Sequence, residues 1–372
     1  MGKYSVQIQK DGTTKYYFIR NLETYEIELL SAKYLTHKTR SNRSPNTIRR
    51  CAFSIAYYLE FLSIKGMKVS DVYKLDYAVQ SEHFVKFLNW LKAGNHREND
   101  IMKLPNNGTC NAYLKDVFGF YLFLEMECSQ FGSLKVLSYN QYITPDSIGV
   151  QKTIRSKGFK GYLKEEERKV KAAEKDEIRE ILQACTNIRD QVLILLLAET
   201  GFRIGEILGV DYVKDIDYRT HIIGVYFRDS NENNARAKNA EYRKAKISDE
   251  TFEFLMFYIA KNRTLLQHQN YLFVNLTGET VGKPLRVDAV YAMLDRMEKK
   301  TGIKITPHML RRYFGNERRK AGWRLELIQL AYGHKHMQTT TKYLNIVDDQ
   351  LLEASQEFYN EHSAIYGIHN LL

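Results

Sequence analysis

Apolar residues recur at helical spacing in two stretches of the chain and predict two helical regions. The first begins at Ser44-Pro45, where serine is an N-cap and proline takes the first helical position. The apolar face of this helix carries Ile48, Ala52, Ile55, Leu59 and Leu62. Further helices are predicted around residues 84–91 and 114–124. Residues 24–140 are therefore expected to form an all-helical domain, whose first helix starts at Ser44.

Short strand-like runs precede that domain, and charged residues follow it. Residues 4–9 and 14–19 are aromatic and β-branched around Asp11-Gly12, which predicts a small hairpin within residues 1–23, too short to be a domain. Hydrophobic periodicity is lost over residues 145–172, which are highly charged and punctuated by glycine. We expect an interdomain linker at residues 141–172.

Periodicity returns in the second region, with helices expected near residues 178–185, 287–299, 307–320 and 325–332. Residues 192–198 (VLILLLA) are apolar on all sides, as in a fully buried helix. Residues 221–227 and 271–274 resemble strands, and the polar stretch 228–246 is expected to turn back as a hairpin with a long loop. The predicted fold is mainly α with a small β-sheet, comprising a second domain at 173–350 and a tail at 351–372.

Charge and composition favour a nucleic-acid partner. Lys and Arg total 55 against 44 Asp and Glu, for a net charge of +11, which attracts polyanions. No stretch has the ~18 consecutive apolar residues of a membrane span, and the first residues lack the apolar core of a signal peptide. The four cysteines are scattered without C-x-x-C spacing, which argues against disulfides and zinc knuckles. We expect a cytoplasmic protein with no membrane partner.

A basic segment, HKTRSNRSPNTIRR at residues 37–50, contains no carboxylate. A helix start with excess cations suits DNA phosphates, and a solvated surface is the equally plain alternative. The candidate DNA-binding residues in it are Lys38, Arg40, Arg43, Arg49 and Arg50.

Two arginines are candidates for holding a phosphate. Gly201 is expected to end the buried helix, which leaves Arg203 just beyond it; a buried guanidinium needs an anion, and Glu206 on the same helix face is the alternative partner. Downstream, Thr306 and Pro307 start a helix on which His308 and Arg311 share one face. Such a pair alone is more often a surface feature than a site.

The segment 327–345 (LIQLAYGHKHMQTTTKYLN) predicts a helix that ends at Gly333, followed by His334 and, nine residues later, Tyr343. Two arginines and two imidazoles can neutralise a phosphodiester and its pentavalent transition state, while tyrosine serves as nucleophile. The departing 5′-oxygen needs an acid, and Lys238 near the turn of the polar hairpin is the candidate. The alternatives Arg236, Lys244 and Lys246 lie nearby.

In this order, the motifs resemble the tyrosine recombinase or phage integrase family. TGFRIGEIL is similar to its first arginine box, HMLRRYF to its H-x-x-R box, and AYGHKHMQTTTKYLN to its Gly-His box and tyrosine. The likeness covers about residues 173–350, and residues 44–126 are similar to the helical, SAM-like core-binding domain. The layout looks closer to transposon-encoded integrases, including the transposase A proteins of transposon 554-like elements, than to phage integrases that depend on many accessory proteins.

The resemblance implies a C-terminal domain with the DNA breaking-rejoining fold and a role for each motif residue. Arg203 and Arg311 would hold the scissile phosphate, His308 would shuttle a proton, and His334 would donate a hydrogen bond to the phosphate. Tyr343 would form a 3′-phosphotyrosyl link, with Lys238 as acid. It also implies a homotetramer on paired double-stranded DNA sites, possible use of accessory recombination proteins, no cofactor, and a tail that docks on a neighbouring subunit.

Some features depart from the family, and three other interpretations stay open. Arg312 stands where many members have histidine, the hairpin around Lys238 is longer than typical, and the first 23 residues are too few for an arm-binding domain. The alternatives are a type IB topoisomerase that relaxes DNA as a monomer, a DNA-binding regulator without cleavage, and a metal site. The metal site would use His308, His334 and His336, but no Cys or carboxylate completes a familiar ligand spacing.

Overall fold

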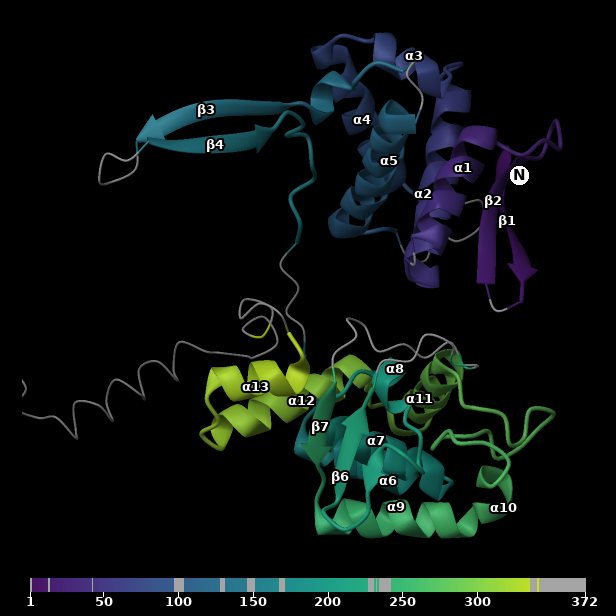
Figure 1. The fold of residues 1–372 in the computed structure, drawn as a ribbon, viewed down its shortest axis with the longest axis vertical. Helices are drawn as coiled ribbons and strands as arrows, with labels where there is room; N and C mark the ends of the chain where they lie inside the picture. Colours follow the sequence, from purple (N-terminus) through teal and green to yellow (C-terminus); the bar gives the residue numbers. More distant parts are fainter. Residues whose placement is uncertain are drawn as a thin grey trace, which may run out of the picture. The chain divides into compact units, whose positions relative to one another are not determined.

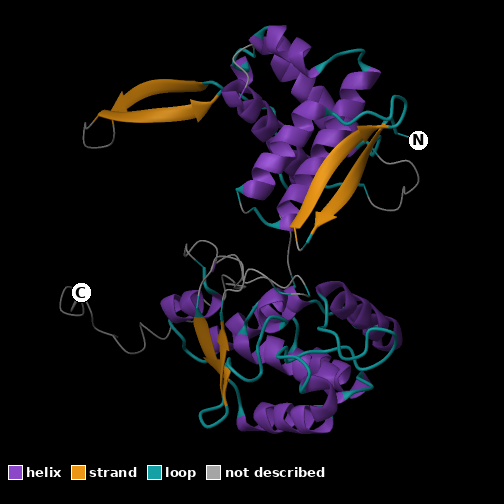
Figure 2. Cartoon of the chain, turned by 45° about the vertical axis from the view of Figure 1, so that its right-hand side comes forward, coloured by secondary structure: helices purple, strands orange, loops and turns teal. Residues whose placement is uncertain are grey.

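The chain divides into two compact units, Met1–Arg168 and Lys169–Leu372 (Figure 1). The structure, a computed structural model, describes residues 2–12, 14–41, 43–96, 104–127, 131–145, 151–166, 171–226, 231, 233, 242–334 and 340. Both units consist mainly of helices, with short antiparallel strands (Figure 2). The predicted fold class is thereby confirmed. Within the described ranges, every helix is too short or too polar to cross a bilayer.

A hairpin opens the first unit, as the sequence predicted. β1 (Tyr4–Asp11) pairs antiparallel with β2 (Thr14–Asn21), and Lys10 lies opposite Lys15 in the register. The buried face of β2 includes Tyr17 and Ile19, which join the core of the helical bundle. The hairpin is therefore part of the first unit's core.

Helices form the rest of this bundle. They are α1 (Leu29–Arg40), α2 (Pro45–Ile64), α3 (Val69–Lys74), α4 (Tyr77–Lys92) and α5 (Asn107–Glu127). Ser44 caps α2 as predicted, because its side chain accepts a hydrogen bond from the amide of Thr47. The expectation that the first helix starts at Ser44 was wrong. α1 precedes it and buries only Ser31, Tyr34 and Leu35, too few apolar positions to show a clear period.

Part of the segment expected to be a linker at 141–172 is ordered structure instead. β3 (Tyr139–Pro145) and β4 (Gln151–Lys157) form a second hairpin after a short 3₁₀ turn, η1 (Lys135–Leu137). Beyond it, Phe159 is buried in the bundle core, and Tyr77 Oη donates to the carbonyl of Gly158 at 2.6 Å. Residues 158–163 therefore pack against the first unit through buried aromatic side chains. The charge and glycine content of the segment did not indicate this packing.

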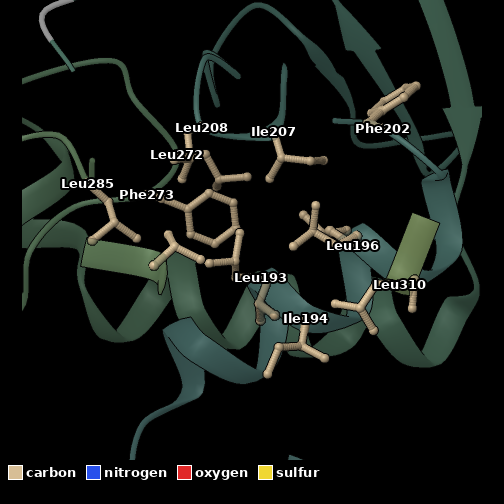
Figure 3. Close-up of a cluster of buried hydrophobic side chains, with 14 of the residues drawn as sticks. Leu193, Ile194, Leu196, Phe202, Ile207, Leu208, Leu272, Phe273, Leu285 and Leu310 are labelled. Atoms are coloured by element: carbon tan, nitrogen blue, oxygen red, sulfur yellow. The ribbon is translucent and has the colours of Figure 1, made fainter. Parts of the chain in front are cut away.

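The second unit is built around α7 (Ile188–Thr200), whose residues Val192, Leu193, Ile194, Leu196 and Leu197 are all at most 1% exposed. Leu193, Leu272 and Phe273 lie together in this core (Figure 3). The remaining helices around it are α6 (Lys175–Ala184), α8 (Ile204–Ile207), α9 (Asp249–Lys261), α10 (Arg263–Leu266), α11 (Val287–Thr301), α12 (Pro307–Lys320) and α13 (Leu325–Tyr332).

A three-stranded antiparallel sheet in the order β5-β6-β7 completes this unit. β5 (Ile216–Asp217), β6 (Ile222–Val225) and β7 (Arg243–Lys246) include the predicted hairpin, in which Val225 pairs with Arg243. The strand expected at 271–274 was wrong: Tyr271 and Val274 form only isolated bridges, to Asp211 and Pro284. Its apolar pattern reflects complete burial of Leu272 and Phe273 rather than sheet pairing.

Candidate active site

Arg311 is buried in the second unit and held there by hydrogen bonds. Its helix, α12, starts as predicted, because Thr306 accepts a hydrogen bond from the amide of Met309 and Pro307 follows it. The Arg311 side chain is only 1% exposed. Nη1 donates to the carbonyl of Gly201, Nη2 donates to the carbonyl of Tyr332 at 2.6 Å, and the guanidinium lies 4.4 Å from the centroid of the Tyr332 ring.

Gly201 supports this arrangement through its backbone. It ends α7 with φ +63°, a conformation that favours glycine, and a Cβ added there would overlap the ring of Phe314. Its carbonyl is thereby turned toward Arg311. Gly201, which was predicted to end this helix, therefore also accepts a hydrogen bond from Arg311.

Glu206 lies between two further arginines. Arg203 Nη1 donates to Glu206 Oε1 at 2.9 Å, and the Arg203 amide donates to Oε2 at 2.7 Å. Arg243 Nη2, from β7, forms an ion pair with the same Oε2. The side chains of Glu206, Arg243 and Arg203 are 2%, 8% and 21% exposed. The Arg203–Glu206 pair anticipated as the alternative therefore forms, and Arg243 shares its carboxylate.

Positive charges lie close together in this cluster. The pKa of Arg311 is lowered to about 9 by burial and next by the positive charge of Arg203, with Glu206 acting against the shift. Arg311 therefore remains protonated at neutral pH. The guanidiniums of Arg203 and Arg243 lie close enough to Arg311 for their charges to lower its pKa, and such a grouping of buried cations favours an anionic ligand. The cluster formed by Arg203, Arg243, Arg311 and Glu206 is hereafter the arginine cluster.

His334 contacts this cluster directly. It follows Gly333, which ends α13 with φ +60°. Its Nε2 lies 3.1 Å from Arg311 Nη2, and its Nδ1 lies 3.1 Å from Thr340 Oγ1. Because a guanidinium can only donate, Nε2 must accept, so the proton of the neutral ring sits on Nδ1.

Burial is also the largest influence on the ionisation of His334. Burial, and then the charges of Arg311, Arg203 and Arg243, lower the pKa of its imidazole to about 3. The ring is therefore neutral at physiological pH. In this arrangement His334 stabilises Arg311 rather than adding a fourth positive charge.

The other predicted site residues are placed less fully. His308 lies in the first turn of α12, one turn before Arg311, and its side chain is exposed. Tyr343, Lys238 and Arg236 lie outside the described residues, as do His336 and the tail at 351–372. Lys244 and Lys246 are exposed on β7, alternating with buried Arg243, so they project from the opposite face of the strand. Among the described residues, no group of three or more His, Cys, Asp or Glu is arranged to hold a metal ion.

Most candidate DNA-binding residues of the basic segment in the first unit are exposed arginines, and one of them also forms an ion pair. Arg40, Arg43 and Arg49 are exposed, and Lys38 lies 4.8 Å from the ring centroid of Tyr34. Arg50 is also exposed, at 49% of its side chain, but it donates two hydrogen bonds to Asp116, of 2.8 and 3.0 Å. The segment contains no carboxylate of its own, but α5 supplies one from 66 positions further along the chain. Arg50 thus joins α2 to α5.

Arg243 was missed by sequence reasoning. It is one of five basic residues between positions 236 and 246, and nothing in their spacing distinguishes it. The distinguishing feature is burial: its guanidinium lies 5.5 Å from the ring centroid of Phe202 and donates to the carbonyl of Ala331 at 3.4 Å. Only the pairing of β6 with β7 places that side chain toward α8.

Comparison with known sequences identifies relatives of this chain. Residues 171–350 match the phage integrase family. Transposase A from transposon Tn554 of Staphylococcus aureus is 26% identical over 339 residues, which cover 86% of this chain and 88% of that protein. Tyrosine recombinase XerA of Saccharolobus solfataricus is 34% identical over 184 residues, covering 50% of this chain and 55% of that protein.

Solved structures share the fold. The Tn1549 transposon integrase in complex with transposon right end DNA aligns with a TM-score of 0.60 and 18% identity, covering 88% of this chain and 98% of that chain. The XerH site-specific recombinase in a post-cleavage complex with palindromic difH aligns with a TM-score of 0.59 and 18% identity, covering 88% and 83%. At these identities the likeness is one of fold.

Proposed function

Since residues 171–350 belong to the phage integrase family and make this chain a tyrosine-type site-specific DNA recombinase, we propose that it cuts and rejoins DNA through a covalent link to Tyr343. The observation that carries this proposal is the arginine cluster, in which the charges of Arg203 and Arg243 act on the buried Arg311. A phosphodiester brings one negative charge, and its pentavalent transition state brings a second. Three guanidiniums gathered around Glu206 and Arg311 can stabilise that charge.

The chemistry can be written so that each proton and bond is balanced. Tyr343 Oη attacks the scissile phosphorus while His308 accepts its proton, and the bond from phosphorus to the 5′-oxygen breaks. Lys238 gives a proton to that oxygen, which leaves as a 5′-hydroxyl. The DNA 3′ end stays attached to Tyr343 as a phosphotyrosyl ester, and a 5′-hydroxyl from a second strand reverses the step. The ester conserves the bond energy, so the reaction requires neither ATP nor a metal.

Arg311 and Arg203 would hold the phosphate oxygens. The guanidinium fork of arginine suits two phosphate oxygens at once, and a buried fork is already oriented before DNA arrives. Arg311 donates hydrogen bonds to the carbonyls of Gly201 and Tyr332 and to His334. These contacts fix the orientation of its guanidinium plane. Loss of such a preorganised donor costs about 3 kcal/mol of transition-state stabilisation.

His334 requires a rearrangement to serve as a phosphate donor. Its Nε2 accepts from Arg311, so it has no proton to offer on that atom. An arriving phosphate offsets the charge of Arg311 and gives that guanidinium an anionic partner. We propose that Arg311 then releases His334, whose imidazole takes the tautomer with a proton on Nε2.

DNA would also contact the first unit. The exposed arginines at the junction between α1 and α2 are Arg40, Arg43 and Arg49. Arg49 also lies near β2, because its positive charge partly offsets the rise in the pKa of Tyr17 that burial causes. We propose that these arginines, with Lys38, hold the DNA backbone, and that four copies act on two paired sites in the cytoplasm, with or without accessory recombination proteins. Similarity to Tn554 transposase A over most of the chain favours movement of a genetic element.

Product analysis separates recombination from relaxation. The probe is a supercoiled plasmid that carries one or both DNA segments flanking the gene, incubated with the full chain and a chelator. We expect strand exchange products only from the two-segment plasmid, with covalent protein–DNA adducts from either. Relaxation of any plasmid without exchange would indicate a type IB topoisomerase, and binding without adducts would indicate a regulator.

A further inference from the structure

The carboxylate of Glu206 is shared between two arginines. Its Oε1 accepts a hydrogen bond from Nη1 of Arg203 at 2.9 Å, and its Oε2 accepts one from the Arg203 amide at 2.7 Å. Arg243 Nη2 forms an ion pair with the same Oε2. Glu206 is buried, so water screens these interactions much less than it would at the surface. The two guanidiniums therefore compete for one buried negative charge.

Arg203 is the more accessible of these two arginines. Its side chain is 21% exposed, against 8% for Arg243. In the proposed reaction Arg203 must bind a second anion, the scissile phosphate, while it still contacts Glu206. A carboxylate that paired with Arg203 alone would oppose that step, because the attraction of one guanidinium would be divided between two anions. The strength of the Arg203–phosphate contact therefore depends on what else Glu206 binds.

Arg243 is held beside Glu206 by contacts with three other parts of the second unit. Its backbone pairs with Val225 of β6. Its guanidinium lies 5.5 Å from the ring centroid of Phe202 and donates to the carbonyl of Ala331 in α13 at 3.4 Å. None of these contacts involves DNA. The positive charge of Arg243 is therefore placed at the carboxylate before any DNA arrives.

We infer that Arg243 is a positioning residue whose charge offsets that of Glu206, so that Arg203 keeps its own positive charge for the scissile phosphate. This inference rests on the proposed function. Arg243 acts through Glu206 and does not need to touch DNA. Glu206 can then orient Arg203 through its Oε1 without neutralising it, because its Oε2 is bound by Arg243.

A double-mutant cycle between Arg243 and Glu206 tests the inference. Arg243→Gln keeps hydrogen-bond donors but removes the charge, whereas Arg243→Lys keeps the charge and loses the planar fork. Glu206→Gln removes the competing negative charge and keeps an acceptor for Arg203. Arg219→Gln is the matched control, because it removes one positive charge from an exposed position on the turn before β6. The measurement is the rate of covalent adduct formation by each full-length variant on DNA flanking the gene.

The expected result is a loss of rate that depends on charge and disappears without the carboxylate. Arg243→Gln should form adducts about 10- to 100-fold more slowly than the parent chain, up to the usual cost of losing an oriented donor. Arg243→Lys should stay within about threefold of the parent, because it keeps the charge. When Glu206→Gln is already present, adding Arg243→Gln should cost less than about threefold, since no carboxylate is left to neutralise Arg203. Arg219→Gln should match the parent.

Several outcomes would overturn the inference. A parent-like rate for Arg243→Gln would show that Arg243 does not act on the reaction, and equal slowing by Arg243→Gln and Arg243→Lys would show that its charge is not what matters. An undiminished loss in the Glu206→Gln background would show that Arg243 acts independently of Glu206. If Arg243→Gln alone does not fold by circular dichroism, the comparison of Glu206→Gln with the double variant carries the test. Failure of the parent chain to form any adduct would instead overturn the proposed function.

Discussion

Arg311 Nη2 and His334 Nε2 lie 3.1 Å apart, a contact that requires the imidazole to be neutral and to accept the hydrogen bond. Both side chains could carry a positive charge, but here the guanidinium of Arg311 donates and the neutral imidazole of His334 accepts. The positive charges around His334 maintain this state, because they lower the pKa of its imidazole to about 3. Both the pH dependence of stability and the resting state of the site follow from this contact.

Stability should fall in acid because of His334. Its folded pKa, about 3, lies below the ordinary value of 6.5, so the unfolded chain takes up a proton that the folded chain excludes. The free energy of unfolding should therefore decrease as the pH falls below about 6.5, by about 1.4 kcal/mol per pH unit, until the pH approaches 3. At pH 5 the loss amounts to about 2 kcal/mol.

Urea unfolding at pH 7 and pH 5 measures this effect. His334→Gln should remove that part of the pH dependence, while His83→Gln should remove only the separate contribution of His83, whose pKa burial lowers to about 4 in the first unit. An unchanged pH dependence in His334→Gln would show that the imidazole is protonated or exposed in the folded chain.

Arg311→Lys should show that geometry matters beyond charge. Lysine keeps one positive charge but lacks the planar fork that reaches the Gly201 and Tyr332 carbonyls together. We expect the rate of adduct formation to fall at least about 100-fold, with DNA affinity changed only a few-fold. Arg319→Lys, an exposed position on the same helix, is the control. A parent-like rate for Arg311→Lys would remove Arg311 from the phosphate site.

Gly315→Ala should displace Tyr332 and thereby disturb Arg311. A Cβ at this position would overlap the hydroxyl of Tyr332, which donates to the carbonyl of Arg311 at 2.7 Å. Tyr332 must then move, and its own carbonyl is a ligand of Arg311. We expect about 1–3 kcal/mol of destabilisation, as in other overpacked interiors, together with slower cleavage. Gly132→Ala, where the added Cβ meets nothing within 4 Å, should change neither.

Two neighbouring arginines of α2 should behave differently. Both are exposed, but the structure shows an ion pair with a carboxylate for Arg50, so Arg49→Ala should weaken DNA binding and reduce the slope of log K against log salt by about one. Arg50 pairs with Asp116, which also accepts a hydrogen bond from Ser54 at 3.0 Å. Asp116→Asn should therefore lower the urea midpoint of the first unit while leaving that salt slope unchanged. The opposite pattern would reverse the two assignments.

Sequence patterns predicted this fold where local chemistry decides the structure. Ser44-Pro45, Thr306-Pro307 and Gly201 are capping signals that act within one turn, and each marks a helix end as expected. Residues 271–274 misled because a short apolar run has the same appearance in a strand as in any buried segment. Helix α1 was missed because its apolar stripe is too sparse.

The sequence predicted those residues of the candidate site that belong to recognisable motifs, and it did not predict Arg243. Arg203, Arg311 and His334 are recognisable from their boxes, and the structure brings these three together. Arg243 depends on the register of β6 with β7 and on burial against α8, which are long-range properties that no local pattern encodes. The state of His334 likewise depends on charges that come from three separate elements.

The central claim is that Tyr343 forms the covalent link to DNA, and peptide mapping of the adduct tests it most directly. The full chain is trapped on DNA flanking its gene, digested, and analysed by mass spectrometry, alongside Tyr343→Phe and the control Tyr359→Phe. We predict that the adduct maps to Tyr343, persists in Tyr359→Phe and disappears in Tyr343→Phe without loss of DNA binding. An adduct that survives in Tyr343→Phe would contradict the account.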